Sequence, residues 1–297
     1  MSDKTKKRAV LALGFFDGVH VGHKKVISLA KNMAQSENAT LVAVTFNGNL
    51  KGFFKSGEKT IFSLDERIFA LKNSGVDEVL LLPLTSEFLS LTAEEFLDWL
   101  NEKYNVIGYA TGDDYTFGKG GQGNVIAIKN YANIHGGKVE TASGEFIDGE
   151  RVSSTAIKRY LQCGNVKKAN EFLGEPYSVT GEVLHGRTVG KTLGFPTVNM
   201  LIDNDKIKLK DGVYAGKVIL DNVTYRTIIN YGARPTFNLD EKLIEAHIIG
   251  FNGNLYGQTI TLKFSGFIRS VMRFNGSEEL IKQLEKDVRE TESGKYD

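Results

Sequence analysis

Short apolar runs alternate with amphipathic segments through the first half of the chain. Four runs have the length and composition of buried strands, over residues 9–16, 39–46, 78–82 and 106–111. The first segment between them has apolar residues at every third or fourth position, including Val26, Leu29 and Met33, which is the spacing of a helix. Regular alternation of strands and helices predicts a doubly wound parallel sheet.

Capping boxes mark two helix starts in this half. Ser63 precedes Glu66 by three positions, and Thr92 precedes Glu95 in the same way. Further elements are predicted as helices near residues 125–133, 154–163 and 166–173 and a short strand near Val139. Together these elements predict an α/β domain over residues 1–175.

The pattern changes after Pro176, where extended segments rich in β-branched and aromatic residues replace the alternation. These segments span residues 177–184, 212–220, 223–232, 243–251 and 258–264. Turn pairs such as Asp221-Asn222 separate them, which predicts a small antiparallel β-barrel. A terminal helix should follow with Ser277 as its N-cap, and this second domain is placed at residues 176–297.

The composition narrows the class of partner. The chain is 41% hydrophobic and 25% charged, as in soluble globular proteins. Its net charge of +1 lacks the basic excess of a nucleic-acid surface, so we expect small-molecule partners and no nucleic acid. The single cysteine, Cys163, indicates a reducing compartment and is expected to be a small packing residue. With no signal-peptide pattern and no bilayer-length apolar run, we expect a cytoplasmic protein without a membrane partner. The oligomeric state stays open.

The stretch LALGFFDGVHVGH, residues 11–23, holds two of the five histidines of the chain. A strand should end at Gly14 and a helix begin near His20, where free backbone N–H groups make a site for phosphate. His20 and His23 are three positions apart, so they face one side and can donate to phosphate oxygens as charge grows. Gly22 leaves room for a triphosphate. A zinc site would need further His or Cys ligands, and the nearby sequence contains none. The alternative is two surface histidines at the start of an ordinary helix.

Two later segments join this stretch, GDDYTFG at residues 112–118 and VSSTAIK at residues 152–158. GFFDGVHVGH and these two segments follow one another in the order of the motifs of the nucleotidylyltransferase superfamily, which they resemble. The resemblance is to the form used by bacterial bifunctional riboflavin kinase/FAD synthetases. The later two are similar to that family's G-x-D-F-x-F-G and S-S-T-x-I-R segments. The resemblance implies a domain that transfers AMP from ATP to the phosphate of FMN and releases pyrophosphate. Such a transfer depends on positioning and charge neutralisation.

The resemblance also implies roles for individual residues of the adenylylating site. His20 and His23 would act in catalysis. Contacts to ATP or its phosphates are implied for Gly14, Phe15, Gly22, Asp114, Ser153, Ser154, Thr155 and Lys158. Two departures from the family pattern stand out: TFNGNL at residues 45–50 replaces T-F-x-P-H-P, and Lys158 replaces an arginine, which removes a bidentate donor. They leave open a riboflavin kinase whose first domain is impaired or inactive.

A near-match to a Walker A loop occurs in the second half, GRTVGKT at residues 186–192. Three residues separate its glycines where four are required, and Pro196 follows in place of a helix. We therefore reject a P-loop. Gly186 and Gly190 still allow the backbone to fold closely over a nucleotide, with Lys191 beside them.

Thr197 and Asn199 lie two positions apart in LGFPTVN, residues 193–199, so they point to one side of an extended strand. Their hydroxyl and amide oxygens are hard ligands suited to Mg²⁺ or another divalent cation, with phosphates and water completing the shell. The alternative is a Thr/Asn ladder on a solvated strand face.

LGFPTVN, GVYA at residues 212–215, NYGARPTF at 230–237 and NLYGQ at 254–258 occur in the order of the riboflavin kinase family, which they resemble. By that resemblance Glu245 is the catalytic base, suited to accept a proton from the 5′-hydroxyl of riboflavin. Arg269 and Phe274 match a loop beside the flavin, although Ser270-Val271 replaces its usual acidic pair. His247 shares a strand face with Glu245, and we expect a packing role for it.

Both resemblances together predict a two-step enzyme that uses ATP to convert riboflavin to FMN and FMN to FAD. A second enzyme hypothesis is the kinase alone. A third, of another class, is a flavin-binding regulator or carrier without turnover; a simple binder would have no need of a metal pair and a base, which disfavours it.

Overall fold

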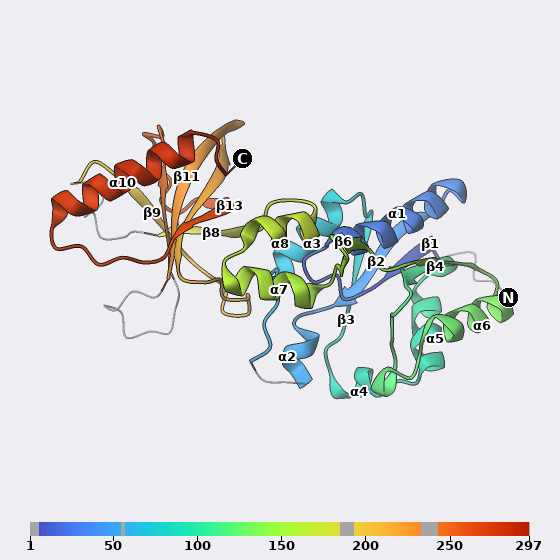
Figure 1. Cartoon of the computed structure of the whole chain (residues 1–297). Helices are drawn as coiled ribbons and strands as arrows, with labels where there is room; N and C mark the ends of the chain where they lie inside the picture. The colour runs from blue at the N-terminus through green and yellow to red at the C-terminus, as the bar shows by residue number, and fades with distance from the viewer. Residues whose placement is uncertain (1–5, 55–56, 185–192, 233–242, 297) are drawn as a thin grey trace. The chain divides into compact units, whose positions relative to one another are not determined.

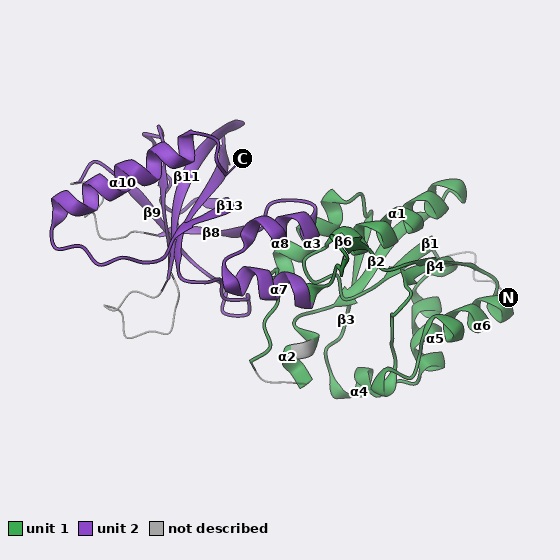
Figure 2. Ribbon diagram, in the orientation of Figure 1, with its two compact units in different colours: residues 1–154 green, residues 155–297 purple. Residues whose placement is uncertain are grey.

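The computed structural model describes residues 6–54, 57–184, 193–232 and 243–296. It divides into two compact units, Met1–Ser154 and Thr155–Asp297, coloured green and purple in Figure 2. This division falls at the start of the helix pair that precedes residue 175, and the domain boundary at 175/176 stays a prediction. The predicted nucleotide-loop residues Gly186, Gly190 and Lys191 lie outside the described residues.

The first unit is built on a five-stranded sheet in which all neighbouring strands are parallel (Figure 1). Its strands are β1 (Arg8–Leu13), β2 (Thr40–Phe46), β3 (Glu78–Leu82), β4 (Asn105–Gly112) and β5 (Lys138–Ala142). The order β3-β2-β1-β4-β5 confirms the doubly wound prediction. Strand order reverses between β1 and β4, which places the expected ligand site at the carboxyl ends of these two strands.

Helices join the strands of this unit. The longer ones are α1 (Val21–Ser36), α3 (Leu64–Asn73), α5 (Ala93–Lys103) and α6 (Val125–His135). Shorter elements are α2 (Leu50–Phe54), α4 (Ser86–Leu89), η1 (Lys119–Gly121), β6 (Phe146–Ile147) and β7 (Glu150–Arg151). Both predicted capping boxes form, because Ser63 and Thr92 accept from the backbone three residues on while Glu66 and Glu95 bond back.

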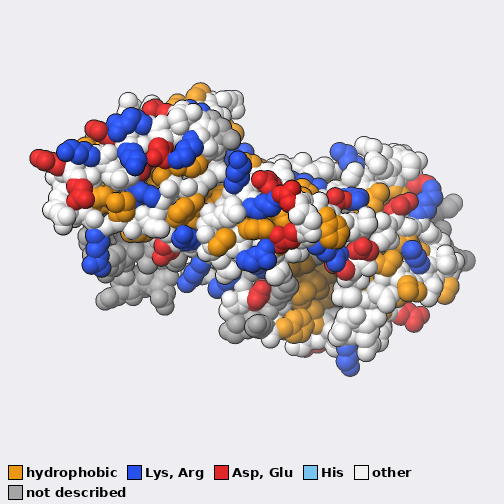
Figure 3. All heavy atoms as spheres, viewed as in Figure 1, with side chains coloured by type: hydrophobic (Ala, Val, Ile, Leu, Met, Phe, Trp, Pro, Cys, Tyr) orange, Lys and Arg blue, Asp and Glu red, His pale blue; other side chains and the backbone are white. Residues whose placement is uncertain are grey.

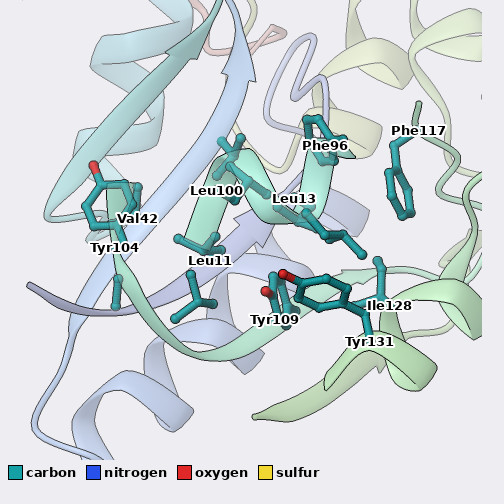
Figure 4. Packing of buried hydrophobic residues seen from close by; sticks show 14 of the residues in the cluster. Leu11, Leu13, Val42, Phe96, Leu100, Tyr104, Tyr109, Phe117, Ile128 and Tyr131 are labelled. Carbon is teal, nitrogen blue, oxygen red and sulfur yellow. The ribbon is translucent and has the colours of Figure 1, made fainter. Parts of the chain in front are cut away.

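The core of this unit lies between the sheet and α5 and α6. Leu11 of β1, Leu100 of α5 and Ile128 of α6 belong to one buried cluster (Figure 4). Helix α1 packs against β1 and β4 through other residues: a Cβ on Gly108 of β4 would lie 2.0 Å from the sulfur of Met33. Burial on both faces explains why β1 and β2 are continuous apolar runs rather than alternating ones.

The second unit is a closed antiparallel barrel, as predicted, in the order β10-β11-β12-β9-β8-β13. Its strands are β8 (Ser178–Leu184), β9 (Thr197–Leu201), β10 (Gly212–Leu220), β11 (Val223–Gly232), β12 (Leu243–Ile248) and β13 (Thr259–Arg269). Asp221 and Asn222 form the β10–β11 turn with φ of 46° and 64°. Positive φ at both positions suits a two-residue hairpin and is tolerated best by Asn, Asp and Gly.

Helices α7 (Ser154–Cys163) and α8 (Val166–Leu173) precede the barrel, and α10 (Ser277–Glu292) packs outside it against β11 (Figure 1). Two expectations are corrected here. Ser277 is the first helical residue of α10, and Gly276 is the N-cap because its extended backbone precedes the first turn. Cys163, the last residue of α7, is exposed rather than packed, and its thiol donates to the Tyr160 carbonyl at 3.3 Å.

The charged side chains reflect the balanced composition. On the face drawn in Figure 3, blue Lys and Arg side chains and red Asp and Glu side chains are interspersed on both units. The near-zero net charge is thus distributed over that face rather than separated into large areas of opposite sign.

Candidate functional sites

The loop after β1 leads directly into α1, and His20 is the N-cap of that helix. Its Nδ1 accepts a hydrogen bond from the backbone N–H of His23 at 3.3 Å. A neutral imidazole carries one proton, so this bond leaves the proton on Nε2. His20 therefore has a donor available on the ring atom that does not cap the helix.

The two imidazoles lie face to face. The ring centroids of His20 and His23 are 3.6 Å apart with an interplanar angle of 16°, and Phe16 packs edge-on to His23 at 5.3 Å. Burial lowers the pKa of His20 to about 4. The pKa of His23 is lowered well below its usual value, mainly by burial and to a smaller extent by the proximity of His20. At neutral pH both rings are uncharged donors, and no described residue bonds to the buried Nδ1 of His23.

The backbone of this loop is strained. Phe16, Gly18 and Val19 have φ of 55°, 83° and 41°. Left-handed conformation is ordinary for glycine but is an outlier for a β-branched residue such as Val19, and such strain clusters at functional sites. A Cβ on Gly22 would lie 3.3 Å from the His20 ring, so glycine lets this turn of α1 pack closely against the imidazole.

Asp17 connects this loop to two other segments, a role that the sequence analysis missed. Its buried Oδ1 accepts from the N–H groups of Ile61 at 2.7 Å and Phe62 at 3.4 Å. The backbone carbonyl of Asp17 accepts a hydrogen bond from the Ser154 hydroxyl at 3.0 Å, so Ser154 of the segment VSSTAIK lies against the β1–α1 loop. These partners are at least 44 positions away from Asp17 in the chain, so no local pattern in the sequence points to them.

The remaining predicted residues of this site lie at α7 and after β4. Ser153 precedes α7, while Thr155 and the buried Lys158 lie on α7 in the second unit. Asp114 follows β4, is 69% exposed, and pairs with Arg151 at 2.9 Å. The same Arg151 nitrogen lies 3.1 Å from Asp113, so an arginine that we did not predict holds both carboxylates.

In the second unit, β9 and β12 bring three predicted residues together. Asn199 lies directly opposite Glu245, and Thr197 lies opposite His247. Opposed residues of an antiparallel pair share a face, so Thr197, Asn199 and Glu245 project from one side. Of the alternate residues, Val198 is half-buried, whereas Met200, Ile244 and Ala246 are fully buried in the barrel core.

This group has the chemistry of a hard-cation site. Asn199 is buried, whereas Thr197 and Glu245 are half-buried. The described residues contain no cluster of three or more His, Cys, Asp or Glu side chains that could hold a metal. A hydroxyl, an amide and a carboxylate nevertheless supply the oxygen ligands that Mg²⁺ prefers when phosphates and water complete its shell.

His247 has structural partners in agreement with its expected packing role. Its Nδ1 lies 2.9 Å from the Pro196 carbonyl, and its ring packs edge-on to Phe195 at 5.4 Å. A pocket of about 540 Å³ adjoins Thr197, with apolar walls that include Phe251 and Tyr256. Its size and lining suit an aromatic ring.

Arg269 has a partner that the sequence analysis did not anticipate. Its Nε and Nη2 donate to the Asp287 carboxylate of α10, at 3.0 and 2.8 Å to Oδ2. Asp287 is only 1% exposed, and the Arg269 guanidinium carbon lies 5.9 Å from the centre of the Phe274 ring. Arg269 therefore ties the end of β13 to α10, beside the loop that carries Phe274.

Fold and sites define a protein with a parallel α/β unit of the nucleotide-binding kind and a small barrel carrying its own oxygen-ligand site. Residues 2–156 match the family model of FAD synthetase, and residues 173–294 match that of riboflavin kinase. The chain belongs to the family of bifunctional riboflavin kinase/FMN adenylyltransferases.

Proteins described by that bifunctional name are similar along almost their whole length. The Bacillus subtilis relative is 35% identical over 95% of this chain and 91% of its own. The Escherichia coli K12 relative is 30% identical over 97% of this chain and 93% of its own. Matches to both domains support the two-activity enzyme over the kinase-only and non-catalytic alternatives.

A crystal structure from Streptococcus pneumoniae has the same fold, with a TM-score of 0.88 and 32% identity over 97% of this chain and 95% of that chain. That protein is described as a macrolide-efflux protein. In the described part of the present chain, no helix is both long and apolar enough to cross a membrane.

Proposed function

We propose that this protein phosphorylates riboflavin to FMN with the second unit and adenylylates FMN to FAD with the first, using ATP in both steps. The observation that carries the proposal is that each unit brings together its own predicted set of side chains. These are a pair of neutral imidazoles at the carboxyl end of β1, and two oxygen ligands beside a carboxylate on β9 and β12.

In the adenylylating step, a phosphate oxygen of FMN attacks the α-phosphorus of ATP as the bond to pyrophosphate breaks. His20 and His23 donate hydrogen bonds to phosphate oxygens, and their neutral state at pH 7 makes each a donor without adding positive charge. Contacts to ATP or its phosphates are also assigned to Gly14, Phe15 and Gly22. Phosphate contacts are assigned to Ser153, Ser154, Thr155 and Lys158. Asp114 can only accept, so its proposed ATP contact is to a hydroxyl or amino group.

In the kinase step, Glu245 accepts the proton from the ribityl 5′-hydroxyl of riboflavin as that oxygen attacks the γ-phosphorus of ATP. Thr197 and Asn199 would hold Mg²⁺ through their oxygens. When bound, that ion would neutralise charge on the ATP phosphates. Gly186, Gly190 and Lys191 are proposed to contact the same phosphates.

For the flavin, Phe274 is the proposed contact, and Arg269 fixes the start of its loop through Asp287. We further propose a cytoplasmic enzyme of small molecules without a nucleic-acid partner, which its balanced charge supports. The domains are proposed to be residues 1–175 for adenylylation and 176–297 for phosphorylation.

The test is an incubation of the whole chain with riboflavin, ATP and Mg²⁺, with FMN and FAD separated by chromatography. We expect FMN first and FAD afterwards. Formation of FMN without FAD, even when FMN is supplied directly, would support the kinase-only alternative. ATP consumption with neither product would refute both activities.

A further inference from the structure

Arg67 joins the loop after β1 to the loop after β2. It lies on α3 and is 2% exposed. Its Nη1 donates to the Phe15 carbonyl at 3.3 Å, and its Nη2 donates to the carbonyls of Phe46 at 2.8 Å and Gly48 at 3.0 Å. The guanidinium carbon also lies 4.7 Å from the centre of the Phe15 ring. One buried side chain therefore fixes two loops at the carboxyl edge of the sheet.

Burial of a charged guanidinium costs free energy, which disfavours arginine at a position that serves packing alone. Burial lowers the pKa of Arg67 to about 10, and the nearby Asp17 carboxylate opposes that shift. Arg67 therefore carries its charge at neutral pH. A buried charge needs compensating hydrogen bonds, which the three carbonyls provide for Nη1 and Nη2, while no described residue bonds to the buried Nε.

The bond to Phe15 orients a donor in the proposed phosphate loop. The Phe15 carbonyl also accepts from the Thr45 hydroxyl at 2.8 Å, so two side chains hold it. In a trans peptide the N–H points opposite to the carbonyl, which directs the Phe16 N–H away from Arg67. No described residue accepts a hydrogen bond from the Phe16 N–H. Arg67 thereby presets a backbone donor four residues before His20.

The bonds to Phe46 and Gly48 hold a segment that lacks proline. TFNGNL, residues 45–50, stands where the family resemblance expects two prolines, and Gly48 has φ of 122°. Without those rings the backbone has more conformations to lose on ordering. The hydrogen bonds from Arg67 restrain the backbone of this segment.

We propose that Arg67 is a positioning residue of the adenylylating site, which holds the phosphate loop and the segment 45–50 in one fixed arrangement without touching substrate. This inference rests on the proposed FAD synthesis by the first unit. Because the residues proposed for phosphorylation lie in the other unit, kinase turnover of the same sample measures how much of the protein is folded and active.

The test compares Arg67→Met, which removes the charge and the donors, with Arg67→Lys, which keeps the charge but replaces the planar guanidinium fork with a single ammonium nitrogen. Arg8→Met is the matched control, because Arg8 is an exposed arginine of the same unit. Rates of FAD formation from FMN and of FMN formation from riboflavin are measured below each variant's melting temperature. We expect kcat for FAD formation to fall about 10- to 100-fold in both Arg67 variants, with little change in KM. FMN formation and the control should be unchanged.

Normal kcat for FAD formation in both Arg67 variants would overturn the positioning role. A parallel loss of both activities, in variants that still melt cooperatively, would also overturn it, because that result would identify a general structural residue. Absence of FAD formation by the unmodified chain would instead refute the proposed function of the first unit.

Discussion

Asn199 and Glu245 occupy directly opposite positions on β9 and β12 and project from the same face of the barrel. They are 46 positions apart in the chain, and only the antiparallel pairing of two barrel strands makes them neighbours. This relationship places a proposed metal ligand beside the proposed base, where the phosphate acceptor and donor must meet.

The carboxylate of Glu245 is predicted to be essential for phosphorylation but not for folding. Glu245→Gln keeps the shape of the side chain and removes the base, so kinase kcat should fall about 100-fold or more. Riboflavin binding, followed by flavin fluorescence, should change little, and FAD formation from supplied FMN should be normal. Glu182→Gln, at an exposed position of β8, is the control. A fully active Glu245→Gln enzyme would remove the base assignment.

Loss of the His23 imidazole should affect FAD formation but not FMN formation. His23→Ala removes one donor of the stacked pair, and FAD formation should fall about 100-fold while FMN formation is retained. The measurement is chromatographic separation of both products from one reaction. His135→Ala, at the exposed end of α6, should leave both rates unchanged. Equal loss of both reactions in the His23 variant would indicate misfolding instead.

Acid should destabilise the protein partly through His20. The folded-state pKa is lowered from 6.5 to about 4, so between these values the unfolded chain binds more protons than the native one. The stability is complete above the unfolded pKa and falls as the pH drops toward the folded one. His20→Asn keeps an N-cap acceptor and removes the titration.

Urea unfolding should therefore show that His20→Asn gains about 2 kcal/mol relative to the unmodified chain when the pH is lowered from about 7.5 to about 5. This change is measured as the difference between the two proteins at each pH. If the two proteins lose stability in parallel over this range, His20 is not responsible for the acid sensitivity.

The pair formed by Arg269 and Asp287 should stabilise the attachment of α10 to the barrel. Asp287→Asn leaves the partly buried arginine without its anionic partner, and the free energy of unfolding should fall by about 3 kcal/mol. Glu285→Gln disrupts an exposed pair with Arg289 on the same helix and should cost less than about 1 kcal/mol. Equal effects of the two substitutions in urea unfolding would contradict this role.

Local patterns in the sequence predicted most of the fold correctly. The capping boxes at Ser63 and Thr92 form, since each depends on residues only three positions apart. The Asp221-Asn222 turn forms for the same reason, because its conformation is set by the two residues themselves. Where the signal was one residue wide, as for Ser277, the helix start was misplaced by one position.

The residues of the sites were suggested by spacing, but their partners were not. His20 and His23 share a helical turn, so their proximity follows from helical geometry alone. Arg151, Asp17 and Asp287 gave no comparable signal, because their partners are distant in sequence or are backbone groups of other segments.

The sequence by itself determined the strand and helix periods, the change of pattern after Pro176 and the two sets of chemistry-bearing residues. Only the tertiary structure decided which strands pair, and therefore that Asn199 faces Glu245 and that Arg67 holds two loops. The reason is physical: hydrophobic periodicity specifies which face of an element is buried. The partner across that face depends on chain packing over long separations.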